Sequence, residues 1–133
     1  MNIENITTIE HILSGIKINK LTDKKAKAVI LKDYLAVRKV VKEAEAEKDE
    51  IVRKFQDDWK EAIQDESKRD DAFHDAQADT VLVLRGIDGR DVDITLDKFP
   101  SAGLYDADLW ADDILLAQIP GSIDFLVENG VAE

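Results

Sequence analysis

The feature that most constrains this chain is the absence of Gly and Pro between Gly15 and Gly86. These two residue types are the strongest local helix breakers, so nothing in the interval forces a helix to stop. The interval is filled mainly with Ala, Lys, Glu, Leu, Val and Arg, most of which favour helices. The sequence therefore predicts one long helix from about Asp23 to Glu66. Asp23 is the expected N-terminal cap, because its carboxylate can accept a hydrogen bond from a free amide of the first turn.

Apolar residues follow one face of this helix at steps of three and four, with one step of seven where Lys48 fills the missing place. This seam consists of Ile30, Tyr34, Val37, Val41, Ala44, Ile51, Phe55 and Trp59. A coiled-coil-like stripe of this kind has to be covered by a partner helix from the same chain or from another. A helix of about 45 residues is roughly 65 Å long, so we expect part of it to project.

A second, shorter helix is predicted by the isoleucines of residues 3–18, which recur at helical spacing. The connector that follows is brief, and a short connector usually makes two helices antiparallel neighbours. We expect this helix to fold back over Ile30, Tyr34 or Val37 and to leave the upper seam uncovered. The sequence therefore predicts a homo-oligomer, most simply a dimer, with Ile51, Phe55 and Trp59 at the contact.

The hydrophobic period changes after residue 79. Residues 80–87 read TVLVLRGI, and residues 90–96 read RDVDITL, a regular alternation. Asp88 and Gly89 stand between them, and this pair favours a type I′ turn with positive φ at both positions. The sequence predicts a β-hairpin here. Two short helices should follow, the first capped by Asp106 and ending near Pro120, the second capped by Ser122 and closed by Gly130.

Taken together, these patterns predict an α+β fold that is predominantly helical. A short N-terminal helix should fold onto a long helix of about 45 residues, and a small unit of one β-hairpin and two short helices should follow. We expect two domains: a helical stalk at residues 1–69, and a small acidic unit at residues 70–133. The acidic unit should pack on the end of the stalk, near Phe55, Trp59 and Ile63.

Composition excludes several classes of protein. The chain has 133 residues and no cysteine, which excludes disulfides, thiolate chemistry and Cys-based zinc sites. Its first ten residues lack the basic segment and apolar run of a signal peptide. No apolar run approaches the length of a membrane span. We therefore expect a soluble, cytoplasmic protein without a membrane partner.

The net charge of −11 is unevenly distributed. Residues 1–69 hold 15 Lys and Arg against 14 Asp and Glu, whereas residues 70–133 hold 3 against 15. Within residues 17–42 there are nine basic residues and only two acidic ones. The basic candidates for contact with phosphate or with an acidic partner are Lys24, Lys25, Lys32, Arg38, Lys39 and Lys42. They spread around the helix, which is also the pattern of a simple solvated surface, and the net charge makes nucleic acid an unfavoured partner.

Residues that could carry chemistry are scarce. The two histidines, His11 and His74, are not spaced as metal ligands, and no phosphate loop, nucleophile elbow or dinucleotide motif is present. The aspartates near residues 106–113 do not follow the calcium-loop pattern. We therefore expect no catalytic residue, no metal and no cofactor, and the chain is not predicted to be an enzyme.

The leading hypothesis is a non-enzymatic structural or protein-interaction protein that self-associates through its long helix, with an unidentified protein as a further partner. Two alternatives stay open. The first is a nucleic-acid-binding accessory protein that uses residues 17–42. The second is an acidic inhibitor or nucleic-acid mimic that uses residues 70–133.

Overall fold

The computed structural model describes residues 1–62 and 69–133. The side chain of Trp59 and those of residues 61–72 are outside this description. The parts of the predicted seam and stalk contact that fall on Trp59 and Ile63 therefore lie outside the described residues.

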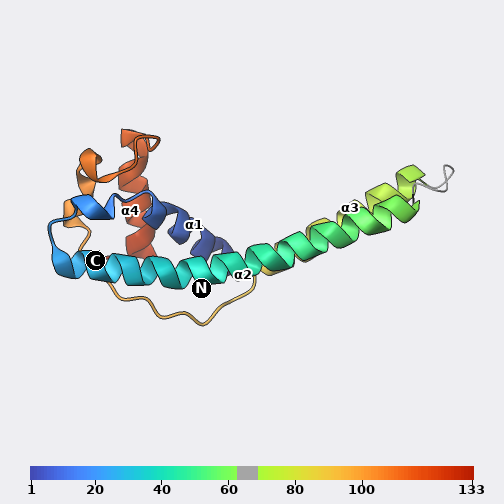
Figure 1. The fold of residues 1–133 in the computed structure, drawn as a ribbon, viewed down its shortest axis with the longest axis horizontal. Helices are drawn as coiled ribbons and strands as arrows, with labels where there is room; N and C mark the ends of the chain where they lie inside the picture. Colours follow the sequence, from blue (N-terminus) through green and yellow to red (C-terminus); the bar gives the residue numbers. More distant parts are fainter. Residues whose placement is uncertain (63–68) are drawn as a thin grey trace.

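The described residues form four α-helices joined by 3₁₀ turns and extended segments. In chain order the elements are α1 (Ile3–Ser14), η1 (Ile18–Lys20), α2 (Lys24–Ala62), α3 (Arg69–Asp88), η2 (Ala102–Tyr105), η3 (Ala107–Leu109), η4 (Leu116–Gln118) and α4 (Ile119–Glu128). Figure 1 shows a head, in which α1, α4 and the 3₁₀ turns lie on one side of the first half of α2. The second half of α2, from Lys48 onward, pairs with α3 to form a projecting arm.

Helix α2 begins where the sequence predicts. The Asp23 carboxylate accepts hydrogen bonds from the amides of Lys25, at 3.0 Å, and Ala26, at 3.2 Å. These bonds satisfy two of the amides that the first turn leaves without an internal partner. With 39 residues, α2 is the longest element that the structure describes.

Helix α1 packs antiparallel on the first half of α2. Its isoleucines at positions 6, 9 and 12 are buried in one cluster with Ile30, Val37 and Val41 of α2. Ile3, at the other end of α1, is buried with Ala44 and with Ile87 of α3. This arrangement agrees with the expectation that the first helix folds back over the start of the long one.

The predicted β-hairpin is wrong. Residues 80–88 continue helix α3, and the described residues contain no β-strand, only three isolated bridges. Asp88 is the last residue of α3, and the Gly89 amide donates to the Arg85 carbonyl at 3.0 Å. Gly89 has no positive φ. The fold is therefore helical in the described residues, and the α+β prediction does not hold.

The physical reason is that α3 covers the upper seam of α2. The rings of Phe55 and Phe73 lie 5.9 Å apart between their centroids. At the base of the arm Lys48 forms an ion pair with Asp88, and Arg90 donates to Glu47 at 2.9 Å. A helix satisfies its own backbone hydrogen bonds while it buries one apolar face, so packing against α2 outweighs the β preference of residues 80–87.

Residues 91–98 form an extended strap that runs along α2 from the arm back to the head (Figure 1). Val92, Ile94 and Leu96 are half-buried against the main core, and the residues between them are exposed. The alternation in the sequence is thus real. The apolar side chains pack on helices instead of on a second strand.

The C-terminal segment also differs from its prediction. The helix expected between Asp106 and Pro120 is replaced by the short turns η3 and η4. Helix α4 starts at Ile119, with Pro120 in its first turn, and not at Ser122. A proline is tolerated there because the first turn leaves its amides without an acceptor.

The main core draws on both sides of the boundary expected at residues 69 and 70. Phe99, Trp110 and Leu126 are buried together with α1 and the first half of α2. The Trp110 indole N–H donates to the Leu104 carbonyl at 2.6 Å, which satisfies its one polar group. The C-terminal segment therefore packs on the first half of α2, away from Phe55.

Gly130 is the glycine that needs its conformational freedom. It has a φ of 74°, and a Cβ added there would meet no heavy atom within 4 Å. We predict that Gly130→Ala lowers the free energy of unfolding by about 1 kcal/mol, because a side chain disfavours this backbone region. Urea unfolding measures this change. Gly89→Ala is the matched control and should cost less. A larger loss at Gly89 would contradict this placement of the backbone strain.

Candidate functional site

A groove runs along the arm between α2 and α3. It has a volume of about 410 Å³ and takes four residues from each helix. Its lining consists of Ile51, Lys54, Phe55, Asp58, Ala76, Asp79, Thr80 and Val83. Ile51 and Phe55 are half-buried, and Val83 is 50 % exposed. The groove therefore has an apolar floor that α3 covers only in part, and a rim that carries charges of both signs.

The predicted seam residues fall into two groups. Ile30, Val37, Val41 and Ala44 are buried by other parts of the same chain. Tyr34, Ile51 and Phe55 are half-buried. Of the seam residues whose side chains the structure describes, Ile51 and Phe55 lie in the arm groove, together with α3 residues that the sequence did not indicate.

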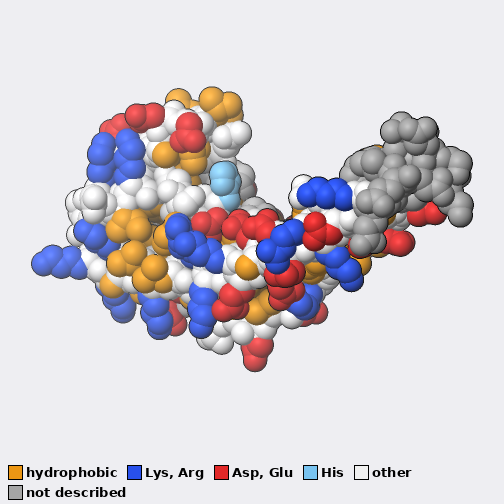
Figure 2. All heavy atoms as spheres, turned by 45° about the vertical axis from the view of Figure 1, so that its right-hand side comes forward, with side chains coloured by type: hydrophobic (Ala, Val, Ile, Leu, Met, Phe, Trp, Pro, Cys, Tyr) orange, Lys and Arg blue, Asp and Glu red, His pale blue; other side chains and the backbone are white. Residues whose placement is uncertain are grey.

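The predicted basic residues are all exposed, and all of them lie in the first half of α2, which belongs to the head. Lys32 forms an ion pair with Asp97 at 2.8 Å. Arg38 donates to the Tyr34 hydroxyl at 2.6 Å, and its guanidinium lies 5.8 Å from the centroid of the Tyr34 ring. No ion pair involves Lys24, Lys25, Lys39 or Lys42 within the described residues. Figure 2 shows basic side chains gathered around the start of α2, with apolar side chains among them.

A buried carboxyl group joins α2 to the strap. Asp33 is 1 % exposed, and its Oδ1 accepts from the Asp97 amide at 3.1 Å. Its Oδ2 is buried and accepts no hydrogen bond from the described residues. Burial raises the pKa of Asp33 to about 6, and the neighbouring charge of Asp97 adds to this effect. The Asp97 amide and Lys32 act in the opposite direction without cancelling it.

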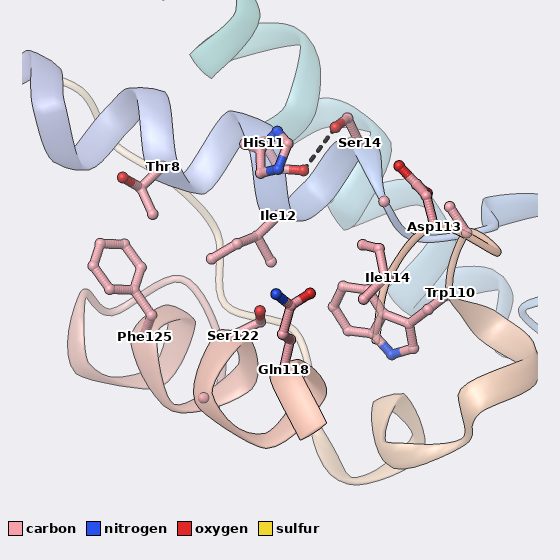
Figure 3. A pocket seen from close by; sticks show the side chains of 13 residues that line it. Thr8, His11, Ile12, Ser14, Trp110, Asp113, Ile114, Gln118, Ser122 and Phe125 are labelled. Carbon is pink, nitrogen blue, oxygen red and sulfur yellow. Dashed lines mark hydrogen bonds between the residues drawn. The ribbon is translucent and has the colours of Figure 1, made fainter. Parts of the chain in front are cut away.

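A second groove lies between α1 and α4, with a volume of about 560 Å³. Figure 3 shows Gln118, Ser122 and Phe125 pointing from the α4 side toward Ile12 of α1. Thr8 and His11 line the opposite wall, and Trp110, Ile114 and Asp113 close one end. A groove of this size with an apolar floor and a polar rim can hold a small molecule or a short peptide.

In the α1–α4 groove, the hydroxyl of Ser14 is not paired with a base. The Ser14 hydroxyl donates to the backbone carbonyl of His11 at 2.7 Å, and not to its imidazole ring (Figure 3). A serine becomes a good nucleophile only when a base accepts its proton. Within the described residues, no three His, Asp or Glu side chains are placed to hold a metal ion.

Comparison with known proteins gives no direct guide to the site. No family model, no curated protein and no solved structure matches this sequence. Among the described helices, none combines the length and the apolar character that crossing a bilayer requires. The interpretation of the grooves therefore rests on their own geometry and charge.

Sequence reasoning missed four residues of the arm groove's lining on α3: Ala76, Asp79, Thr80 and Val83. Thr80 and Val83 were overlooked because residues 80–87 are predicted as a strand, and Ala76 and Asp79 because no packing partner is predicted for the residues just before that strand. A helical signal was present, since Phe73, Ala76, Thr80 and Ile87 are separated by three, four and seven residues. This spacing continues a seam through about four helical turns and is typical of a helix that packs on another.

The buried Asp33 gives a pH-dependent prediction. Its pKa is raised from 3.8 to about 6 in the folded chain, so the folded state holds the proton more tightly than the unfolded state. The free energy of unfolding should therefore fall as the pH rises from about 4 to about 6 and then level off. We predict that Asp33→Asn stabilises the protein at pH 7.5 by up to about 3 kcal/mol, because it removes a buried charge and keeps the oxygen that accepts from Asp97.

Urea unfolding of both proteins between pH 4 and pH 7.5 measures this effect. The difference between the variant and the original chain should shrink toward pH 4, where the folded chain is protonated at Asp33. Asp93→Asn is the matched control, because Asp93 is an exposed carboxylate on the same strap and does not contribute to the pKa of Asp33. Parallel pH profiles for Asp33→Asn and the original chain would show that Asp33 is not the titrating group.

Proposed function

We propose that this protein is a non-enzymatic structural or interaction protein that self-associates through its arm, in the cytoplasm. In the proposed dimer, two arms pack against each other and form a four-helix bundle from two copies of α2 and α3. The observation that supports it is the arm groove, whose apolar floor of Ile51, Phe55 and Val83 is covered on one side only.

The construction of the arm from only two helices favours a second arm as its partner. A two-helix hairpin buries only one stripe of each helix, whereas a bundle of four helices encloses a complete core. Packing a second arm into the groove removes the remaining exposed area of Ile51, Phe55 and Val83 from water. Such burial is favourable by roughly 25 cal/mol for each Å² of apolar surface.

The charges on the rim favour a second copy over an unrelated helix. Lys54 and Asp58 border the groove on α2, and Asp79 borders it on α3. In a twofold dimer the same patch meets itself, so Lys54 of each copy can approach an aspartate of the other. A rim with one sign of charge would repel its own copy, whereas this one is self-complementary.

The first prediction on this function concerns Val83. Val83→Glu places a charge in the groove, so it should weaken the dimer at least tenfold in Kd, equivalent to about 1.4 kcal/mol. At about 0.15 M salt, where exposed ion pairs are screened, sedimentation velocity should show the original chain at twice the monomer mass of 14.9 kDa and the variant at the monomer mass. Leu82→Glu is the matched control, because Leu82 is 65 % exposed on α3 but does not line the groove. Equal dimerisation of both variants, with unchanged helix content, would exclude the arm groove as the contact.

The second prediction concerns the charges of the rim. Lys54→Glu leaves acidic residues alone on the rim and should weaken the dimer, whereas adding Asp58→Lys restores both signs and should recover it. The exchange keeps oppositely charged residues four positions apart on α2, so the helix itself should not suffer. Failure of the double variant to dimerise better than Lys54→Glu would argue against contact between the two rims.

A further inference from the structure

Helix α2 carries an exposed face that the arm contact does not use. We define this basic face as Lys24, Lys27, Leu31, Leu35, Arg38 and Lys42. At about 100° per residue these six positions fall within an arc of about 80°, which lies beside Ile30 and Val37 with its centre about 110° from them. Leu31 is 45 % exposed and Leu35 is 58 % exposed.

Leucines at the centre of a basic face indicate the kind of partner. Within the described residues no ion pair involves the four cations of this face. A phosphate backbone would use the cations and leave Leu31 and Leu35 without an apolar contact. A partner helix with its own apolar stripe and acidic flanks would satisfy both kinds of side chain.

The chain itself contains such a surface on η4 and α4. We define this acidic face as Leu115, Leu116, Asp124, Val127 and Glu128, all of which are exposed. Leu115 and Leu116 are 65 % and 72 % exposed. No Lys or Arg follows Lys98, so no basic residue of the C-terminal segment opposes the charge of this face.

The spacing of the two faces matches. Arg38 and Lys42 stand four residues apart on α2, and Asp124 and Glu128 stand four residues apart on α4. Side chains at this spacing lie about 6 Å apart on a helix surface, so both pairs can meet at once when the helices pack side by side.

The two faces cannot meet within one molecule. The opposite side of α4 carries Ile119, Ile123 and Leu126, which are buried in the main core. On α2 the basic face flanks Ile30 and Val37, which are buried in the same core, and Lys27 and Leu31 line a cavity with the connector after α1. Asp124 and Glu128 therefore point away from the core that α4 shares with α2, and cannot reach the basic face of their own chain.

We propose that the basic face of α2 binds the acidic face of α4 on a second copy of this chain. The contact joins two different surfaces, so each copy keeps one free face of each kind and the contact can repeat from copy to copy. It uses no residue of the arm groove and does not rest on the proposed arm dimer. Where both contacts form, they link the copies into an extended assembly.

The strength of this contact should depend steeply on salt. Its ion pairs are exposed, and such pairs are weak and screened beyond about 10 Å at 0.1 M salt. The net charge of −11 also repels neighbouring copies. We therefore expect association at low salt and at high protein concentration, with loss of the larger species when salt is added.

The test exchanges the charges of the two faces in the full-length chain carrying Val83→Glu, which removes the arm contact. One variant adds Arg38→Glu and Lys42→Glu, so that both of its faces are acidic. The other adds Asp124→Lys and Glu128→Lys, so that both of its faces are basic. Sedimentation velocity at low salt should show neither variant associating alone, whereas their equimolar mixture should recover the association of the Val83→Glu parent.

A matched control reverses Lys60 and Lys98 to Glu, which changes the net charge equally at two exposed positions outside the basic face. This control should associate at least tenfold more tightly than the Arg38 and Lys42 variant.

The proposal is overturned if the parent stays monomeric at low salt, if the mixture fails to recover association, or if the control loses it equally. It is also overturned if the basic face binds phosphatidylserine vesicles or duplex DNA while the parent does not self-associate. If Val83→Glu leaves the arm dimer intact, the comparison still stands, because all the variants share that background.

Discussion

The apolar stripe of α2 is longer than any other described helix can cover. Helix α1 has 12 residues and reaches from Ile30 to Ala44, whereas the stripe continues to Ile51 and Phe55. A second helix is needed for the upper half, and α3 supplies it. The chain must therefore reverse after α2, and the strap must then return along α2 to bring the C-terminal segment to α1. The division into head and arm follows from this one requirement.

The sequence predicts the elements whose signals are local. The run without Gly and Pro, the spacing of the isoleucines and the carboxylate of Asp23 identify α1 and the start of α2, because helix formation and capping depend on near neighbours. Gly130 is another such case, since positive φ after a helix is a property of the residue itself. These features hold whatever packs around them.

The hairpin prediction is wrong because the structure of residues 80–87 depends on what they pack against, and the sequence pattern alone does not show this. Residues 80–87 suit a strand by composition and a helix by spacing, and the uncovered stripe of α2 decides between the two. The alternation of Val92, Ile94 and Leu96 is correct, but alternation shows only that one side of an extended segment is buried. The pattern of apolar residues therefore indicates that Ile51 and Phe55 need a cover, but it does not indicate that Val83 and Asp79 are part of that cover. Leu31 and Leu35 were likewise passed over because they lie off the seam.

The two proposed contacts differ in their physical basis, and this difference separates them. The arm contact buries apolar side chains in a groove and matches a surface with itself, so it closes at two copies and depends little on salt. The contact between the α2 and α4 faces joins unlike surfaces, so nothing in its geometry closes it, and its attraction acts through exposed charges. In this proposal, the separation of charge along the sequence produces two surfaces of opposite charge that attract each other between copies. Basic residues near the start of α2 and acidic residues on α4 lie on outward faces of one rigid core, where each can attract a neighbour while the total charge limits how far the association proceeds.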